Sequence, residues 1–256
     1  MEKLSAIVIT KNEIINIDGL IDNLEFADEI IVVDSFSTDG TYEKLKTIDD
    51  VKVFQKEFKN FPDQKNYAMG LASHDWVLFI DADERVTPDL NEEIKSILNQ
   101  EGSDIVAYNA HFQYYFGKTP VNYSGFQSAK SFRLFRNSCC EYDMARPVHE
   151  NLIVNGRTGL LKNRIAHFSF RDFDHYKEKM RLYAHLKARQ LHKKGQRSNF
   201  FKAYIKPLYR FINHYIMRLG ILDGKVGYDI SILNAYEVKE RYRELKRLNS
   251  LNSKVV

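Results

Sequence analysis

The stretch Trp76-Val77-Leu78-Phe79-Ile80-Asp81-Ala82-Asp83-Glu84 decides the fold of this chain. Its five apolar residues are rich in β-branched and aromatic types, which is typical of a strand buried on both faces of a parallel sheet. The acids follow at the carboxyl end of the strand, where open α/β sheets bind ligands. Asp81 and Asp83 are two residues apart, so they point to the same side and repel each other unless a positive charge lies nearby. A divalent cation that carries an anionic ligand of its own fits this requirement.

A second interpretation of the same acids needs no ligand. Asp-x-Asp arises by chance in many loops, and the strand would then simply turn into solvent before a helix that starts at Thr87-Pro88. The tripeptide alone does not separate the two interpretations, so the rest of the chain has to decide.

The composition is that of an ordinary globular protein, with 44% hydrophobic and 28% charged residues among 256. This argues against global disorder and allows one large domain, or one domain with an appendage. Cys139 and Cys140 are adjacent, have no third cysteine to pair with and lack zinc-ligand spacing, so they indicate a reducing compartment and receive no role. Met1-Glu2-Lys3 leads directly into a strand and is not typical of a signal peptide. We therefore expect a cytoplasmic location.

The net charge of +4 hides a strong asymmetry along the chain. Residues 1–170 contain 18 Lys and Arg against 26 Asp and Glu, a net charge of −8, whereas residues 171–256 contain 20 against 8, a net charge of +12. We therefore expect a catalytic domain over 1–170 and a basic tail over 171–256. A basic segment of this strength favours an anionic partner such as membrane lipid or nucleic acid.

Apolar strands alternate with helices in the first hundred residues. Strands are expected at Leu4–Ile9, Glu29–Asp34 and Val51–Gln55, ahead of the one that begins at Trp76, with a helix in each connection. Alternation of this kind implies parallel pairing and right-handed crossovers. The predicted fold class is α/β, with a Rossmann-like, mostly parallel sheet flanked by helices and a helical tail at the C-terminus.

Three of these strands end in polar groups, and the carboxyl ends of parallel strands meet at one edge of the sheet. The groups are those of Thr10–Glu13, Asp34–Ser35 and Asp81–Glu84. The chain has no G-x-G-x-x-G after its first strand and no G-K-[ST], which argues against a dinucleotide enzyme and a P-loop NTPase. The phosphates of a bound nucleotide would need a metal ion and side chains such as Lys65.

After a helix over Pro88–Leu98 the pattern changes to looser alternation. The segments Ile105–Phe116, Ser131–Phe135 and Leu152–Val154 predict an antiparallel or mixed extension of the sheet that forms the second wall of the site. Arg133 and Arg136 lie in this extension, where they either serve the site or only pair with acids.

Five segments of the chain follow one another in a recognisable order: Ile9–Glu13, Val32–Thr41, Gln64–Ala68, Trp76–Glu84 and Pro147–Glu150. In this order they resemble the inverting family 2 glycosyltransferases of glycosyltransferase A fold, and especially the branch of lipopolysaccharide core glucosyltransferases. The resemblance covers residues 4 to about 170. It implies transfer of a sugar from a nucleotide-diphosphate sugar, first of all a UDP-sugar, to a hydroxyl of a glycan or lipid-linked acceptor, with inversion at the anomeric carbon. It implies no nucleic acid partner.

The same resemblance assigns donor-binding roles to five residues. It places Thr10, Glu13 and Asp34 in the nucleoside pocket, with Asp34 contacting the base or ribose. Lys65 matches a basic position near the diphosphate, and Asp81 matches a position close to the ribose. Two of these residues have a simpler alternative, because Glu13 would also suit the first turn of a helix and Lys65 would also suit a solvated helix face.

Metal binding and catalysis fall on other residues of the matching motifs. Asp83 matches the ligand of a divalent cation, Mg²⁺ or Mn²⁺, and Glu150 matches the catalytic base. His167 resembles a late histidine that completes the metal or diphosphate site, although His149 competes for that role and His167 would also suit an ordinary buried position. A hydroxyl that attacks an anomeric carbon must lose its proton, so one carboxylate has to stay uncoordinated as the general base. Glu84 receives no role.

The tail predicts three helices, with the middle one from Asn199 to Leu219 and a kink at Pro207. Basic residues recur there at every fourth position, as Lys202, Lys206, Arg210, His214 and Arg218. Aromatic and aliphatic residues fill the remaining surface, but no apolar run is long enough to span a bilayer. Such a helix suits the interface of an anionic membrane leaflet. The alternative is a helix packed on the catalytic domain with its basic edge in water.

Two further function classes stay open. A nucleotidyltransferase also uses carboxylates on an α/β sheet, but normally with a basic or glycine-rich phosphate loop. A non-catalytic module would keep the fold and dock on a membrane through the basic tail, although it would have no need of the acids. The sequence does not identify the sugar, the acceptor or the linkage.

Overall fold

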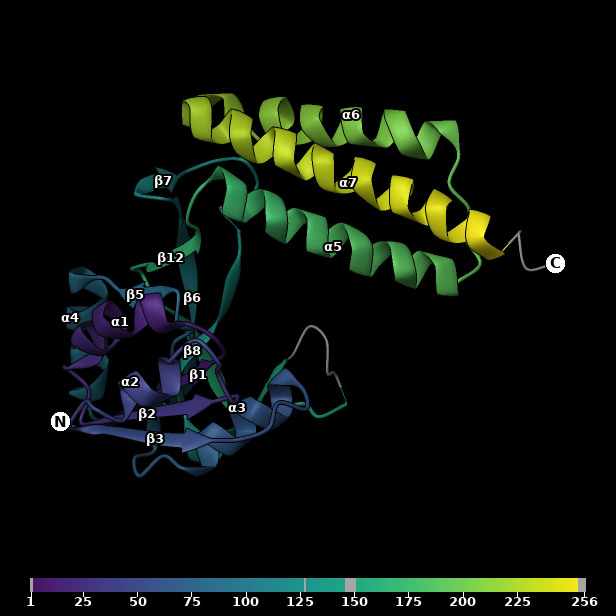
Figure 1. Cartoon of the computed structure of the whole chain (residues 1–256). Helices are drawn as coiled ribbons and strands as arrows, with labels where there is room; N and C mark the ends of the chain where they lie inside the picture. Colours follow the sequence, from purple (N-terminus) through teal and green to yellow (C-terminus); the bar gives the residue numbers. More distant parts are fainter. Residues whose placement is uncertain (1, 127, 146–150, 253–256) are drawn as a thin grey trace. The chain divides into compact units, whose positions relative to one another are not determined.

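The computed structural model describes residues 2–126, 128–145 and 151–252 (Figure 1). The chain forms two compact units. The first unit consists of Met1–Phe112 and Ala129–His167, and the second of Gln113–Ser128 and Phe168–Val256. The sequence-based division at residue 170 stays a proposal about how function is shared along the chain.

The first unit is built on four parallel strands, as the sequence predicted. They are β1 (Leu4–Thr10), β2 (Glu29–Asp34), β3 (Val51–Gln55) and β4 (Trp76–Phe79). Their order in the sheet is β3-β2-β1-β4, and the register places Thr10 beside Asp34 at the carboxyl edge. The polar ends of β1 and β2 are therefore neighbours in space, as the alternating pattern required.

Helices follow each of β1 to β3 and β5 (Glu84–Val86). They are η1 (Ile14–Asn16), α1 (Ile17–Leu24), α2 (Thr41–Leu45), α3 (Phe61–Gly70) and α4 (Pro88–Leu98). Asn60 caps α3 by accepting a hydrogen bond from the Asp63 amide, and Thr87 caps α4 in the same way. Both helices carry proline in their first turn, where no backbone donor is lost. The predicted bounds of α4 are confirmed.

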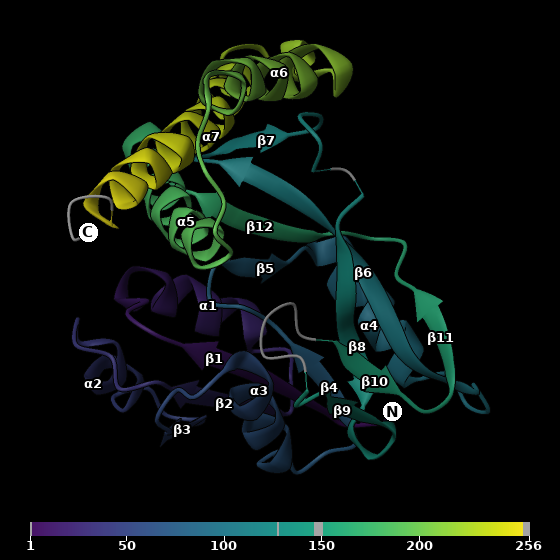
Figure 2. The same cartoon turned by 90° about the vertical axis from the view of Figure 1, so that its right-hand side faces the viewer.

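Six further strands extend the sheet with mixed pairing, in the order β3-β2-β1-β4-β8-β6-β12-β5, with β7 and β11 paired to β6 (Figure 2). These strands are β5 (Glu84–Val86), β6 (Ile105–Phe116), β7 (Thr119–Val121), β8 (Lys130–Arg136), β11 (Arg157–Leu160) and β12 (Ile165–Phe170). In contrast, β9 (Cys140–Tyr142) and β10 (Leu152–Val154) pair only with each other in a separate two-stranded antiparallel sheet. The prediction that Leu152–Val154 extends the main sheet is therefore wrong. β8 runs antiparallel to β4, and β12 runs antiparallel to β5, with His167 opposite Glu84. The sequence did not predict β5, and its pairing brings His167 to the acids.

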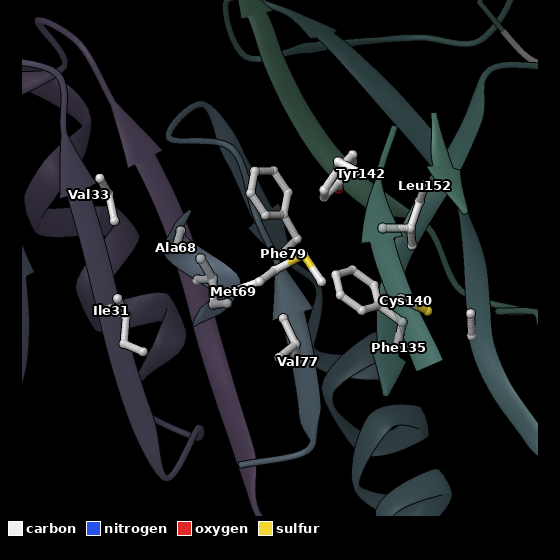
Figure 3. Close-up of a cluster of buried hydrophobic side chains, with 12 residues drawn as sticks. Ile31, Val33, Ala68, Met69, Val77, Phe79, Phe135, Cys140, Tyr142 and Leu152 are labelled. Carbon is white, nitrogen blue, oxygen red and sulfur yellow. The ribbon is translucent and has the colours of Figure 1, made fainter. Parts of the chain in front are cut away.

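The core of the first unit surrounds β4, the strand that begins at Trp76 (Figure 3). Val77, Phe79 and Phe135 are completely buried, and the ring of Tyr142 meets that of Phe79 edge to face at 6.2 Å. Residues Val77 to Ile80 have no exposed surface, which confirms a strand buried on both faces. Full burial of such side chains contributes about 1.5–3 kcal/mol each, so β4 is a rigid base for the acids that follow it.

Glu29 is a buried carboxylate at the opposite, amino-terminal edge of the sheet. It accepts hydrogen bonds from the Ser5 hydroxyl at 2.6 Å, from the Ser73 amide at 2.9 Å and from the Ser73 hydroxyl at 2.7 Å, and it pairs with Lys52. Burial alone would raise the pKa of this carboxyl, but the hydrogen bonds from Lys52, Ser5 and Ser73 outweigh burial and lower the pKa to about 2. Glu29 thereby fastens β1 and β2 to the segment before β4.

Because the pKa of Glu29 is lower in the folded state, its stabilising contribution is complete above about pH 4.5 and disappears as the pH falls toward 2. We expect the free energy of unfolding to fall between pH 7 and pH 3 by on the order of 1–2 kcal/mol more in the wild type than in Glu29→Gln. Urea titrations at both pH values measure this. Glu57→Gln, which changes an exposed glutamate, should behave like the wild type. An equal loss in Glu29→Gln would contradict the prediction.

The second unit is mainly helical. Its elements are α5 (Phe173–Lys193), η3 (Phe201–Ile205), α6 (Lys206–Ile212), η4 (Asn213–Met217), η5 (Gly220–Asp223) and α7 (Gly224–Asn252). α7 lies between α5 and the α6 segment (Figures 1 and 2). Pro207 lies in the first turn of α6, directly after the π-helical η3, so the helix type changes at the position of the predicted kink. The kink itself stays a prediction. None of the described helices combines the length and apolar composition that membrane crossing requires.

Candidate active site

A cleft of about 340 Å³ lies at the carboxyl edge of the parallel strands in the first unit. Its walls are formed by Ile9, Thr10, Lys11, Glu13, Ser35, Phe58, Phe61, Asp81, Ala82 and Asp83. Four residues with predicted site roles therefore share one cavity, although they come from the ends of two strands that are about seventy positions apart. The structure thus brings together the polar groups of β1 and β4.

Asp34, the predicted contact to base or ribose, is completely buried beside this cleft. Its carboxylate accepts hydrogen bonds from the Thr10 hydroxyl at 3.3 Å, the Ser37 amide at 2.9 Å and the Gln55 amide group at 3.2 Å. These bonds tie the end of β1 to the loop after β2. Asp34 thus fixes the loop beside the cleft, and its contact with the base or ribose of a ligand stays a prediction.

Glu13 also lines the cleft. It accepts a hydrogen bond from the Asn16 side chain at 2.6 Å, and its own amide donates to the Thr41 hydroxyl at 2.9 Å. Asn12 adopts a left-handed conformation, with φ of 57°, and its side-chain oxygen accepts from the Thr38 amide at 2.8 Å. The loops after β1 and β2 are therefore held to each other by polar contacts of short side chains.

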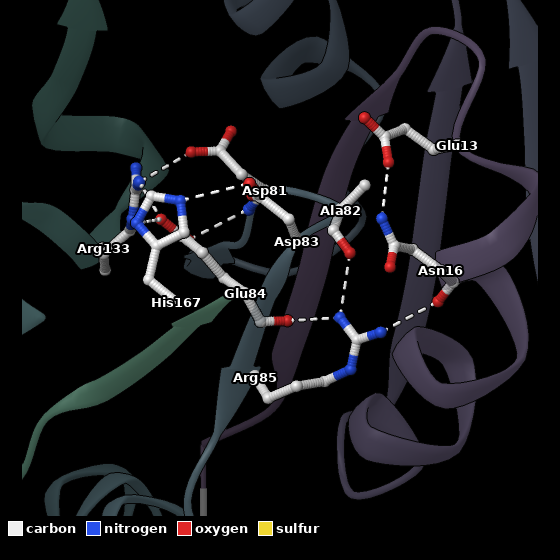
Figure 4. A network of polar contacts seen from close by, with 9 residues as sticks. All are labelled: Glu13, Asn16, Asp81, Ala82, Asp83, Glu84, Arg85, Arg133 and His167. Carbon is white, nitrogen blue, oxygen red and sulfur yellow. Dashed lines mark hydrogen bonds and ion pairs between the residues drawn. The ribbon is translucent and has the colours of Figure 1, made fainter. Parts of the chain in front are cut away.

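Arg133 is the cation that offsets the acids after β4 (Figure 4). One of its Nη atoms donates to Asp81 Oδ2 and to Glu84 Oε1, both at 2.7 Å, and its side chain is almost fully buried. Burial lowers the pKa of Arg133, but the carboxylates of Glu84 and Asp81 raise it above its ordinary value. Burial raises the pKa of Glu84 to about 7, against the opposing effect of Arg133.

The turn that carries Asp83 is fixed from both sides. Glu84 accepts a hydrogen bond from the Asp81 amide at 3.1 Å and donates one from its own amide to the Asp81 carbonyl at 2.9 Å. Arg85 donates to the carbonyl oxygens of Ala82 at 2.9 Å, Glu84 at 2.6 Å and Asn16 at 2.9 Å. Glu84, which had no role in the sequence analysis, is thus a buried partner of Arg133 that closes this turn.

Asp83 and His167 face each other across this turn. Their Oδ2 and Nε2 atoms are 3.3 Å apart, and His167 Nδ1 lies 3.9 Å from Glu84 Oε1. The Phe112 ring lies 5.6 Å from the imidazole. The antiparallel pairing of β12 with β5 produces this approach, so the predicted metal residues are adjacent in space.

The donor set suits a hard cation that takes most of its ligands from a substrate. Within residues 2–126, 128–145 and 151–252, no three His, Cys, Asp or Glu side chains converge to enclose a metal ion. Mg²⁺ usually binds proteins through one or two carboxylates and completes its coordination with water and substrate phosphates. The Asp83 carboxylate fits that mode, and the His167 imidazole beside it adds a softer nitrogen donor. Asp81, in contrast, is engaged by Arg133.

Lys65 lies on the inner face of α3 and is only 5% exposed. Its Nζ lies 4.6 Å from the centre of the Phe79 ring and 5.0 Å from that of Tyr142. The alternative of a solvated helix lysine is therefore wrong. Arg136, in contrast, pairs with Glu2 and Asp75 at the surface, as expected of a residue that only pairs with acids.

Glu150, the predicted base, lies outside the described residues, as do its neighbours Pro147, Val148 and His149. Their roles stay predictions.

Phe58 and Phe61 line the cleft and were missed in the sequence analysis. Their rings meet edge to face at a centroid distance of 5.0 Å, and they are 45% and 47% exposed. Beside them Lys11 donates to the carbonyl oxygens of Ser35 and Phe36, both at 2.6 Å. The sequence signal that could have identified them is a pair of aromatic residues three positions apart in an otherwise polar segment. Exposed rings of this kind suit contact with a flat ligand group.

The fold is the mostly parallel α/β sheet that the sequence predicted, with acids at its carboxyl edge, and it agrees with the expected glycosyltransferase A fold. Residues 5–155 match the family model described as "Glycosyl transferase family 2". The chain therefore belongs to glycosyl transferase family 2.

Similar proteins extend over nearly the whole chain. The lipopolysaccharide core biosynthesis glycosyltransferase LpsC of Rhizobium meliloti is 28% identical over 261 residues, covering 96% of this chain and 95% of LpsC. An uncharacterized glycosyltransferase of Rickettsia conorii is 30% identical over 273 residues, covering 100% of this chain and 93% of its own length. Among solved structures, S. aureus TarS 1-349 is 20% identical with a TM-score of 0.48, covering 94% of this chain and 91% of that one.

Proposed function

We propose that this glycosyltransferase is a metal-dependent, inverting enzyme that transfers a sugar from a nucleotide-diphosphate sugar to a hydroxyl of a glycan or glycolipid. The observation that carries the proposal is the pairing of Asp83 with His167 at 3.3 Å, next to a cleft that also contains Thr10, Glu13 and Asp81. The likeness to LpsC supports a place in the synthesis of lipopolysaccharide or another surface glycan.

Different residues of the cleft would bind different parts of the nucleotide-sugar donor. Thr10 and Glu13, with Asp34 behind them, would bind the nucleoside of a UDP-sugar, and Asp81 would lie near its ribose. Asp83 and His167 would hold Mg²⁺ or Mn²⁺ beside the diphosphate. When bound, the cation stabilises the negative charge that develops on the leaving nucleotide diphosphate. Arg133 keeps Asp81 in place, because its guanidinium is itself fixed by Glu84.

The acceptor hydroxyl must lose a proton when it attacks the anomeric carbon, and we assign that proton to Glu150. A positioned general base contributes about 10²–10⁴-fold to such a reaction. Glu84 is unsuited to this task, because its side chain is completely buried and bound to Arg133.

Replacing Glu150 by glutamine tests the function directly. We expect Glu150→Gln to bind the nucleotide sugar like the wild type, as measured by the shift in thermal unfolding, and to lose transfer by at least about 10²-fold. Rates are measured with a panel of radiolabelled nucleotide sugars, with and without Mn²⁺. Glu141→Gln, which alters an exposed glutamate on β9, should keep the wild-type rate. Near-normal transfer by Glu150→Gln would remove Glu150 from the base role.

The second unit supports a proposal about the surface on which the enzyme binds its acceptor. Nine large apolar side chains between Phe200 and Met217 are 37% to 73% exposed. They form the α6 face, which consists of Phe200, Phe201, Tyr204, Ile205, Leu208, Tyr209, Ile212, Ile216 and Met217. Exposed apolar surface of this extent marks an interaction site. We assign it to an anionic membrane surface at the cytoplasmic side, because cationic side chains of the same helix accompany it.

Flotation with phosphatidylglycerol vesicles measures this docking. The protein is expected to float with the vesicles at low salt and to dissociate as salt increases. A chain that stays behind and sediments as a dimer would instead assign the α6 face to a second copy.

A further inference from the structure

A cationic pocket of about 400 Å³ lies between α6 and α7 in the second unit. It is lined by Lys206, Tyr209, Arg210, Asn213, Arg218, Val238, Arg241 and Tyr242. Four of these eight side chains are cationic, and the others add two phenol hydroxyls and one amide. The lining contains no carboxylate, so the pocket offers many hydrogen-bond donors around one small volume.

Nearby acids neutralise this charge only in part. Glu237 pairs with Arg241 along α7 and lies 3.6 Å from Lys187. In the part of the chain that the structure describes, no carboxylate lies within 4.0 Å of the cationic nitrogens of Lys206, Arg210 or Arg218. Three of the four cations are therefore available to an anionic ligand.

His214 holds one of these cations without adding a charge. Its Nδ1 lies 2.9 Å from the Ser124 carbonyl oxygen, and its Nε2 lies 3.5 Å from Arg210 Nη1. Burial lowers the pKa of His214, and Arg210 and Arg218 lower it further. The neutral tautomer that donates through Nδ1 leaves Nε2 as an acceptor for Arg210. The buried imidazole thus orients the Arg210 guanidinium.

The aromatic wall orients a second cation. Lys206 Nζ lies 3.3 Å from the Tyr242 hydroxyl and 5.6 Å from the centre of its ring. Tyr242 is almost completely buried, at 4% exposure, and belongs to a core cluster of the second unit. A rigid residue therefore fixes one side of the pocket, which distinguishes it from a set of mobile surface lysines.

The pocket adjoins the α6 face. Tyr209 belongs to both, and its helix neighbours Leu208 and Ile212 are 56% and 37% exposed. A ligand that combines an anionic head with an apolar body would contact the cations and the α6 face at the same time. Guanidinium groups bind phosphate through paired N–H donors.

We propose that this pocket binds the phosphate headgroup of an anionic membrane lipid. The inference rests on the proposed membrane docking and adds a specific headgroup site to it. An apolar face alone would hold the chain on any bilayer, whereas the pocket selects lipids whose phosphate can enter between Lys206 and Arg210. A phosphomonoester, as in phosphatidic acid, would be favoured because it carries more charge and more acceptor oxygens than a phosphodiester.

Vesicle flotation with pocket variants of the full chain tests the inference. The vesicles are phosphatidylcholine with either phosphatidic acid or phosphatidylserine at matched surface charge. We expect the wild type to prefer phosphatidic acid, and Lys206→Gln with Arg210→Gln to weaken that binding by about tenfold or more. The control pair Lys239→Gln with Lys246→Gln removes the same charge from exposed positions of α7 outside the pocket, and should change it by less than about threefold. Thermal unfolding checks that both pairs fold.

Further arms identify the ligand and separate the two proposals. Arg210→Lys keeps the charge but loses the paired donors, so it should retain only part of the phosphatidic acid preference. Equal losses in the pocket and control pairs, or no headgroup preference in a wild type that still floats, would overturn the headgroup site and leave membrane docking standing. Binding of glycerol 3-phosphate in solution without vesicle binding would overturn the lipid as its source. Hydrolysis of the nucleotide-sugar donor should be unchanged in every variant. A failure of the proposed transferase function would therefore be detected independently of lipid binding.

Discussion

Asp83→Asn is expected to lower metal-dependent turnover of the nucleotide sugar by roughly 10²–10³-fold, the usual loss when one group that stabilises transition-state charge is removed. Asparagine keeps the size of the side chain but loses its negative charge, so the proposed pair with His167 would no longer hold a divalent cation firmly. The initial rate of nucleotide release, measured against Mn²⁺ concentration, should show both a lower maximum and a higher half-saturating concentration.

Asp89→Asn provides the matched control for this experiment. Asp89 lies in the first turn of α4, is exposed and does not line the cleft, so its replacement should leave the rate and the metal dependence unchanged. If Asp83→Asn turned over at the wild-type rate with the wild-type response to Mn²⁺, the cation would have to be held elsewhere, and the proposed role of Asp83 would be wrong.

Arg133→Met is expected to destabilise the first unit by about 3–5 kcal/mol, because it leaves the carboxylates of Glu84 and Asp81 without their common cation. Urea unfolding measures the loss through the fluorescence of Trp76, the single tryptophan of the chain, which is buried in β4. Part of the loss should be recovered in Arg133→Met combined with Glu84→Gln, since glutamine removes the buried charge and can still accept from the Asp81 amide.

Arg136→Met on the same strand separates burial from the mere loss of an arginine. Arg136 pairs with Glu2 and Asp75, which are 44% and 40% exposed, so its replacement should cost about 1 kcal/mol or less. The two variants are compared by their urea midpoints, because Arg136 also lies 4.6 Å from the Trp76 ring and influences its emission. Similar costs for both variants would show that the Arg133 ion pair contributes nothing beyond a surface pair.

The order of strands and helices in the first hundred residues was predictable because each element is coded locally. The runs Leu4–Thr10, Glu29–Asp34 and Val51–Gln55 are the observed strands, and Pro88–Leu98 is the observed helix. An apolar run that ends in a polar group defines a strand and the edge at which it ends. The convergence of Thr10, Glu13, Asp81 and Asp83 on one cleft followed from that rule.

The partners of the acids were not predictable, because they depend on strand pairing over long distances. Arg133 is 49 positions from Glu84 and 52 from Asp81, and only the antiparallel placement of β8 beside β4 brings it under the turn. His167 reaches Asp83 because β12 pairs with β5, a three-residue strand without a pattern of its own. A shift of one residue in either register would turn these side chains to the other face of the sheet.

The tail shows the same division between local pattern and tertiary packing. Its sequence predicted a basic stripe at every fourth position, but His214 is buried, uncharged and bound to the Ser124 carbonyl, so the stripe is not one continuous solvent-facing surface. The cationic pocket needs Arg241 from α7, 23 positions beyond Arg218. The sequence alone determined the β-α-β order, the edge of the sheet that carries the acids and the cationic, aromatic character of the tail, since these depend on residue type and period. Only the tertiary structure decided which cation meets which carboxylate, because such contacts depend on register and packing between segments far apart in the chain.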